Sequence, residues 1–173
     1  MKELEIVEKA KEGTRTPKPG LEKSDVLSML ILYSGVVMDT RAIEECTRLN
    51  FEGKIDFGEN VKRLIGAGAV WYCVDLVQLK KVSYGADDAY TESLPLTDTV
   101  KVGNRFSARA ITDAIAATQR KETDYPEFLR RLIAGGCVYY VIFMKGRKMT
   151  YVGSLGESHD EDFPEQLIRY LES

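Results

Sequence analysis

Apolar residues at helical spacing follow an aspartate at two places in the chain. The apolar positions after Asp56 are Val61, Leu64 and Ile65, and a matching set follows Asp124. Steps of three and four residues place such side chains on one face of a helix. An aspartate in front of the first turn accepts the free amide hydrogens of that turn. The pattern predicts two amphipathic helices that begin after these aspartates and end at glycines near residues 68 and 136.

The pattern changes to that of β-strands after each of these helices. Aromatic and β-branched side chains, which are typical of strands, dominate both stretches. The predicted strands, in chain order, are 70–77, 80–84, 89–94, 137–144, 148–152 and 157–160. Further helices are predicted at 41–49, 108–119 and 163–171.

The chain repeats this pattern after 68 positions. Asp56 aligns with Asp124, and Glu59 aligns with Glu127 at the spacing of a capping box. Other aligned pairs are Arg41 with Arg109, Arg63 with Arg131, Gly68 with Gly136, Tyr72 with Tyr140 and Gly85 with Gly153. Because a unit of this size buries too little surface alone, the two units are expected to pack together. We expect an α+β fold in which duplicated α-α-β-β(-β) units form a pseudo-dimer, with a closing C-terminal helix.

These elements divide the chain into three parts. Residues 1–37 have no counterpart in the repeat and are predicted to be an N-terminal extension that is partly disordered. Residues 38–104 are predicted to form the first half of one compact domain, and residues 105–173 the second half.

Charge and cysteine usage narrow the class of protein. The net charge of -3 argues against a general polyanion binder, so nucleic acid is not expected as a partner. Cys46, Cys73 and Cys137 have no metal-ligand spacing, and an odd number fits a reducing cytoplasm. Cys73 and Cys137 lie in apolar runs and are expected to be buried. No stretch reaches the roughly 20 apolar residues of a membrane span, so no membrane partner is expected. We also expect no cofactor and no metal.

Two pairs of adjacent aromatic residues are the first candidate for a binding site. Trp71 and Tyr72 form one pair, and Tyr139 and Tyr140 form the other. Neighbouring residues of a strand point to opposite faces, so each pair presents one ring to each face of the sheet. Two uses remain open for these rings: a buried interface between the halves, or an exposed platform for a ligand or partner.

Polar candidates are found in the second half. His159 lies in an acidic stretch with Glu157, which suggests metal binding or acid–base chemistry. Zinc sites need three or four convergent ligands, so a solvated turn is the simpler interpretation. Arg130 belongs to a basic cluster, interpreted as a solvated face with an anion contact as the alternative. The other members of this second-half basic cluster are Arg131, Lys145, Arg147 and Lys148.

Several short motifs resemble a known family. In chain order they are Met38-Asp39-Thr40-Arg41-Ala42-Ile43-Glu44, Asp56-Phe57, Tyr84-Gly85-Ala86-Asp87, Asp124-Tyr125-Pro126-Glu127 and Gly156-Glu157-Ser158-His159. Their order resembles an uncharacterised bacterial family, the domain of unknown function 1398, some members of which carry the label "phage envelope protein". The resemblance covers nearly all of residues 38–165. It implies an α+β fold with two related halves and no established activity, so it supplies no catalytic residues.

The sequence therefore predicts a small cytoplasmic binding or regulatory protein without catalytic activity. Its partner, a small molecule or a protein, is expected to bind between the two halves. The candidate binding residues are Trp71, Tyr72, Tyr139, Tyr140, Arg130, Glu157 and His159. One alternative is a hydrolase-like or metal-assisted enzyme that uses Glu157 and His159. Another is a nucleic-acid-associated factor that uses the second-half basic cluster.

Overall fold

The structure of the chain is a computed structural model that describes residues 37–97 and 100–173. The predicted extension over residues 1–37 therefore lies outside the described residues, except for its last position. The elements are α3 (Thr40–Phe51), α4 (Phe57–Gly66), β1 (Trp71–Asp75), β2 (Lys80–Tyr84), β3 (Ala89–Ser93), α5 (Ala108–Gln119), α6 (Tyr125–Ala134), β4 (Cys137–Phe143), β5 (Lys148–Gly153), β6 (Ser158–Asp162) and α7 (Glu165–Glu172). The predicted α+β class and the helix at the C-terminus are confirmed.

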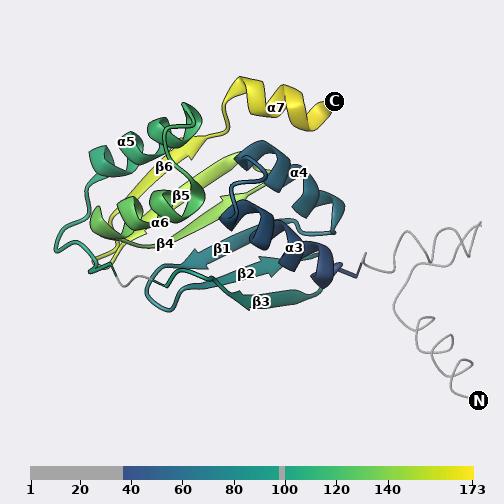
Figure 1. Ribbon diagram of the computed structural model, residues 1–173, viewed down its shortest axis with the longest axis horizontal. Helices are drawn as coiled ribbons and strands as arrows, with labels where there is room; N and C mark the ends of the chain where they lie inside the picture. The colour runs from purple at the N-terminus through teal and green to yellow at the C-terminus, as the bar shows by residue number, and fades with distance from the viewer. Residues whose placement is uncertain (1–36, 98–99) are drawn as a thin grey trace, which may run out of the picture. The chain divides into compact units, whose positions relative to one another are not determined.

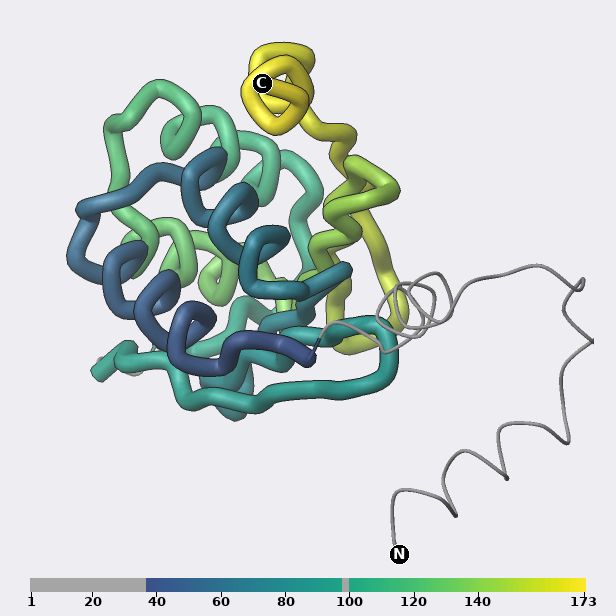
Figure 2. The backbone as a smooth tube through the Cα atoms, turned by 90° about the vertical axis from the view of Figure 1, so that its right-hand side faces the viewer, coloured from purple at the N-terminus to yellow at the C-terminus, as the bar shows by residue number. Residues whose placement is uncertain are grey.

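One antiparallel sheet runs through both halves of the described chain. Its strand order is β3-β2-β1-β4-β5-β6, so each half contributes three consecutive strands. Helices α3, α4, α5 and α6 lie on one face of this sheet (Figure 1), and the view turned by 90° places them to one side of the strands (Figure 2). The hydrophobic core lies between this helical layer and the inner face of the sheet.

The two halves join where β1 pairs with β4, and the register of this pair is symmetric. Cys73 lies opposite Val141, which is also its counterpart 68 positions further along. On either side of this centre, Trp71 pairs with Phe143 and Asp75 pairs with Tyr139. A shift by 68 positions turns each of these two pairs into the other. Helices α3 and α5 also begin and end 68 positions apart, as do α4 and α6. The halves thus share one order of elements, while their origin by duplication stays a prediction.

Asp56 and Asp124 cap α4 and α6 as the sequence predicts. The Asp56 carboxylate accepts the N–H of Glu59 at 3.0 Å, and the Asp124 carboxylate accepts the N–H of Glu127 at 2.8 Å. The two glutamate carboxylates bind arginines one turn further along the same helices. Each capping box is therefore formed only in its aspartate half.

The first strand ends earlier than the predicted range of 70–77. β1 stops at Asp75, whose carboxylate accepts the N–H groups of Val77 and Gln78 at 2.8 and 2.7 Å. These hydrogen bonds turn the chain away from the sheet. Leu79 completes the turn in the left-handed region, with a φ of 53°, and β2 begins at Lys80.

A buried ion pair distinguishes the first half from the second. The Lys81 ammonium on β2 lies 3.2 Å from the Glu92 carboxylate on β3 and donates to the Thr47 hydroxyl at 2.8 Å. Burial lowers the pKa of the Lys81 ammonium, and the neighbouring Glu92 opposes that shift. The counterparts of Lys81 and Thr47 in the second half are the apolar residues Met149 and Ile115. At these equivalent positions the first half therefore buries polar side chains and the second half apolar ones.

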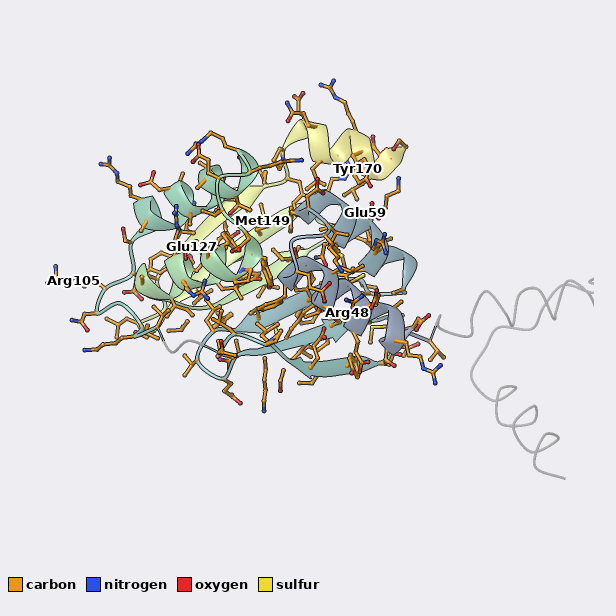
Figure 3. All side chains as sticks on the ribbon, in the orientation of Figure 1. Arg48, Glu59, Arg105, Glu127, Met149 and Tyr170 are labelled. Carbon is orange, nitrogen blue, oxygen red and sulfur yellow. The ribbon has the colours of Figure 1, made fainter. Side chains whose placement is uncertain are left out.

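Helix α7 adds an element that breaks the symmetry of the halves. It packs against α4, and its Tyr170 hydroxyl hydrogen-bonds to the Glu59 carboxylate; both residues are labelled in Figure 3. The ring of Phe163, just before α7, makes an edge contact with Phe57 at a centroid distance of 5.8 Å. Neither α7 nor any other helix in the described ranges is long and apolar enough to cross a membrane.

The N-caps lead to the first prediction. Asp124→Ala is expected to lower the free energy of unfolding by about 0.5–2 kcal/mol, because the first turn of α6 loses its side-chain acceptor. Asp124→Asn is expected to restore most of that loss, since the amide oxygen still accepts the N–H of Glu127. Denaturant unfolding of both variants measures the difference. Equal damage by Ala and Asn would show that capping is not the role of this carboxylate.

The second prediction concerns the buried ion pair. Lys81→Met is expected to destabilise the fold by about 3–5 kcal/mol, because it leaves the Glu92 carboxylate buried without a cation. The double variant Lys81→Met with Glu92→Gln is expected to recover much of that loss. Lys148→Met is the matched control, because its ion pair with Asp160 is exposed and should cost at most about 1 kcal/mol. Thermal and denaturant unfolding test all three, and equal costs for the two lysine variants would contradict the argument.

Candidate functional site

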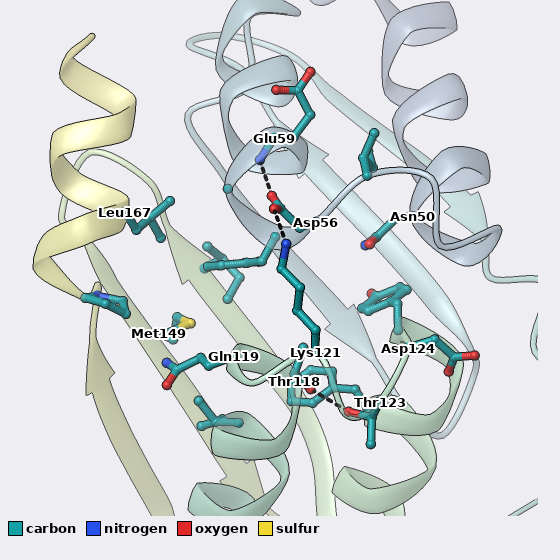
Figure 4. A pocket seen from close by; sticks show the side chains of 18 of the residues that line it. Asn50, Asp56, Glu59, Thr118, Gln119, Lys121, Thr123, Asp124, Met149 and Leu167 are labelled. Atoms are coloured by element: carbon teal, nitrogen blue, oxygen red, sulfur yellow. Dashed lines mark hydrogen bonds and ion pairs between the residues drawn. The ribbon is translucent and has the colours of Figure 1, made fainter.

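A groove of about 1010 Å³ opens between the two halves on the helical side of the sheet (Figure 4). One wall is the α3–α4 loop together with the start of α4. The other wall is the end of α5, the α5–α6 loop and the start of α6. Residues of α7 line it as well, and side chains of β1, β4 and β5 form its floor. The groove therefore lies where the sequence predicts a site, between the halves.

Tyrosines from both halves meet at the floor of the groove. Tyr72 of β1, Tyr140 of β4 and Tyr151 of β5 come from strands, and Tyr125 comes from the first turn of α6. The hydroxyl oxygens of Tyr125 and Tyr140 lie 2.8 Å apart, within hydrogen-bond distance. The rings of Tyr140 and Tyr151 are also in contact, with centroids 5.6 Å apart. We refer to these four residues as the tyrosine cluster.

Burial keeps the tyrosine cluster neutral. It is the largest cause that raises the pKa of each of the four phenols above its ordinary value. A phenolate in this apolar environment would lose its hydration. The four hydroxyls consequently remain O–H groups at neutral pH and offer both hydrogen-bond donors and acceptors.

Polar residues from both walls lie at the rim of the groove. The Lys121 ammonium lies 3.9 Å from the Asp56 carboxylate and links the two walls (Figure 4). Lys121 occupies the left-handed position that ends α5, with a φ of 58°, where the first half has Gly53 with a φ of 65°. Asp124 lines the opposite wall. Both N-cap aspartates are thus helix caps and rim residues at the same time.

The aromatic pairs divide between the two faces of the sheet as the alternation of a strand predicts. Tyr72 and Tyr140 point into the groove, while Trp71 and Tyr139 lie on the face that the helices leave open. Trp71 stacks on Tyr84 at a centroid distance of 3.7 Å, and Tyr139 is 43% exposed. One ring of each pair is therefore buried beneath the helices and the other lies on the open face, where binding of a ligand or partner stays a prediction.

The open face also corrects the expectation for the cysteines. Cys137 is buried as expected, but Cys73 is only half-buried. The reason is its register: it alternates with Tyr72 and Val74, whose side chains occupy the covered face. Cys73 thus lies on the uncovered side of the sheet, at the centre of the β1–β4 pair.

Glu157 and His159 do not converge on one site. The Glu157 carboxylate accepts the N–H of Leu155 at 2.9 Å within the turn before β6. The His159 ring binds Glu161 at 2.7 Å and lies 3.2 Å from the Thr112 hydroxyl of α5. These contacts hold a turn and attach the edge strand to a helix. Among the described residues, no group of three or more histidine, cysteine or acidic side chains is arranged to hold a metal ion.

The second-half basic cluster is largely neutralised by carboxylates. Arg130 and Arg131 both lie near Glu127, at 3.7 and 3.0 Å. The remaining ion pairs of the cluster are Arg147 with Glu172 and Lys148 with Asp160. Arg130 does not line the groove, and neither do Glu157 and His159. Of the seven residues predicted for the site, the structure therefore brings only Tyr72 and Tyr140 to it.

Sequence reasoning missed Tyr125 and Tyr151. Tyr151 could have been predicted from the sequence, because it shares one face of a predicted strand with Met149 and alternates with Thr150, which lies on the other face. Tyr125 follows the cap Asp124, and its place at the floor depends on how α6 crosses the sheet. No local sequence pattern predicts how a helix crosses a sheet, so Tyr125 could not be assigned to the site from the sequence.

Comparison with known proteins gives no match, either to a protein-family model or to a curated protein. The geometry of the groove is therefore the basis for the functional proposal.

The tyrosine cluster leads to a prediction about alkaline pH. In the unfolded chain each phenol ionises near pH ~10, whereas in the folded chain burial raises its pKa. Their contribution to stability is therefore fully present below that pH and is lost as the pH rises above it. We expect the free energy of unfolding to fall steeply in alkaline solution, measured by denaturant unfolding at successive pH values. Replacing Tyr72 and Tyr140 with Phe should make the fall shallower, and an unchanged slope would contradict the prediction.

Proposed function

We propose that this protein binds a small, largely apolar molecule in the groove between its halves and acts as a binding or regulatory module without catalytic chemistry. The observation that carries the proposal is the groove itself, which has an aromatic floor built from both halves and a polar rim. Small-molecule sites are typically concave, mostly apolar and supplied with a few placed polar groups. Its volume of about 1010 Å³ lies at the upper end of the range of ligand pockets, roughly 300–1,000 Å³.

The difference between the halves supports binding at this position. Met149 and Ile115 both line the groove, and their counterparts in the first half are Lys81 and Thr47 of the buried ion pair. The groove therefore receives apolar side chains at the positions where the first half buries polar ones. An apolar ligand can contact these side chains, and the apolar surface that it removes from water contributes favourably to the free energy of binding.

Neither alternative function has a comparable observation in its favour. An enzyme that uses Glu157 and His159 needs these groups to converge in a concave site. Both side chains are instead engaged in turn and strand contacts outside the groove. A nucleic-acid-associated factor needs basic side chains that are available to phosphates. Three cations of the second-half basic cluster are paired with acidic side chains at 3.0 Å or less.

Cytoplasmic location and membership of the domain of unknown function 1398 are part of the same proposal. They rest on the cysteine usage and on the ordered motifs of the sequence. Membership would supply no activity, so the test must address the groove directly.

Ligand capture tests the proposed function. Native mass spectrometry of the full chain is expected to show a mass increment that disappears on denaturation. Gln119→Trp places a large ring at the last residue of α5, where Gln119 lines the groove (Figure 4). We expect this variant to weaken ligand binding at least about tenfold, which corresponds to about 1.4 kcal/mol.

Arg109→Trp is the matched control for this variant. Arg109 lies on the same helix, its side chain is exposed, and it does not line the groove. It is expected to leave ligand occupancy unchanged. Equal occupancy in the Gln119→Trp variant and in the unmodified protein would overturn the proposal that the groove is the site.

A further inference from the structure

Two hydroxyl hydrogens of the tyrosine cluster have no acceptor among the described residues. Tyr125 and Tyr140 share one hydrogen bond, so one of these hydroxyls donates and the other keeps its hydrogen. The Tyr151 hydroxyl donates to the Met149 sulfur at 3.6 Å. The Tyr72 hydroxyl makes no hydrogen bond to any described residue, although Tyr72 is only 3% exposed and lines the groove. Two donors therefore remain: that of Tyr72 and that of the accepting hydroxyl in the Tyr125–Tyr140 pair.

The two donors face the same groove. Tyr72 and Tyr140 flank the Cys73–Val141 pair on the covered side of the sheet, and the Tyr125 hydroxyl hydrogen-bonds with that of Tyr140. A carbonyl oxygen has two lone pairs and can accept from two donors at once. Among the described residues the buried polar side-chain atoms without a partner belong to Asn60 and Ser83, so the unpaired Tyr72 hydroxyl is accessible from the groove. A ligand acceptor at this point would form a hydrogen bond shielded from bulk water.

The floor of the groove disfavours charged ligands. Four carboxylates and two ammonium groups line the groove, namely Asp56, Glu59, Glu122 and Asp124 with Lys54 and Lys121. Glu59 and Glu122 are also paired with Arg63 and Arg120, so the charges at the rim are balanced. An anion at the floor would lose its hydration next to buried phenols and would meet no cation among the residues of the floor. The buried floor likewise holds no carboxylate that could pair with a cation. An uncharged molecule avoids both costs.

We propose that the groove selects an uncharged, largely apolar molecule that carries a carbonyl oxygen, and that the Tyr72 hydroxyl donates a hydrogen bond to this oxygen. The inference rests on the proposed function and adds the chemical class of the ligand to it. Tyr72 is then the residue that determines specificity, while the aromatic and aliphatic floor supplies the contact area.

A matched set of naphthalene probes tests the class on the full chain. Acetylnaphthalene carries a neutral carbonyl, ethylnaphthalene has nearly the same shape without an acceptor, and naphthoate carries a negative charge. We expect acetylnaphthalene to bind about 2- to 10-fold more tightly than ethylnaphthalene, as one net hydrogen bond allows. Naphthoate should bind most weakly. Calorimetric or fluorescence titration measures all three affinities.

Conservative variants assign the preference to one hydroxyl. Tyr72→Phe keeps the ring and is expected to abolish the preference for acetylnaphthalene over ethylnaphthalene. Tyr139→Phe removes a hydroxyl from the opposite face of the sheet and is expected to preserve it. If Tyr72→Phe lowers the melting temperature too far for titration, Tyr125→Phe removes a second hydroxyl of the cluster and should reduce the preference.

The outcomes separate this inference from the proposed function. Suppose that the probes bind the unmodified protein and do not bind the Gln119→Trp variant. If the acetyl and ethyl forms then bind with equal affinities, the ligand class is overturned, while the groove remains a binding site. Tightest binding of naphthoate would also overturn the class. Two outcomes would overturn the proposed function itself. In the first, the Gln119→Trp variant binds every probe as tightly as the unmodified protein does. In the second, no probe binds and no ligand is captured.

Discussion

The antiparallel pairing of β1 with β4 is the interaction on which the rest of the structure depends. It joins three strands from each half into one sheet, so that neither half leaves its first strand as an open edge. Its symmetric register, centred on Cys73 and Val141, also decides which side chains meet. Tyr72 and Tyr140 fall on the covered side of this centre. A slip of β1 by one residue against β4 would turn Tyr72 to the open face and bring Trp71 under the helices.

Symmetry of the backbone does not extend to the chemistry of the two cores. The first half buries a lysine, a glutamate and a threonine hydroxyl beneath its helices, and these groups satisfy one another. The second half has Met149 and Ile115 at the positions of the lysine and the threonine, and these apolar side chains border the groove. Apolar surface needs no fixed partner geometry, whereas a buried ion pair does. The core of the first half is thus fixed by its own ion pair, whereas the apolar side chains of the second half can pack against contacts of different shapes.

Two structural residues also lie at the proposed site. Asp56 and Asp124 cap helices and at the same time line the rim, because both α4 and α6 begin beside the groove. Their carboxylates are engaged with backbone N–H groups and cannot turn freely toward a ligand. In the proposed function, the selectivity of the groove therefore depends on the tyrosine cluster at the floor, whose hydroxyls do not all find a partner among the described residues.

The sequence by itself determined the features that depend on a few neighbouring residues. The aspartate caps, the helical stripes, the strands and the α+β class follow from spacing and local hydrogen bonding, and so does the division of Trp71 from Tyr72 between opposite faces. Only the tertiary structure decided which face became the groove, that Tyr125 and Tyr151 join Tyr72 and Tyr140 there, and that Glu157 and His159 are engaged elsewhere. Those outcomes depend on strand register and on the crossing of helices over the sheet. Such long-range packing brings together residues that no local pattern relates.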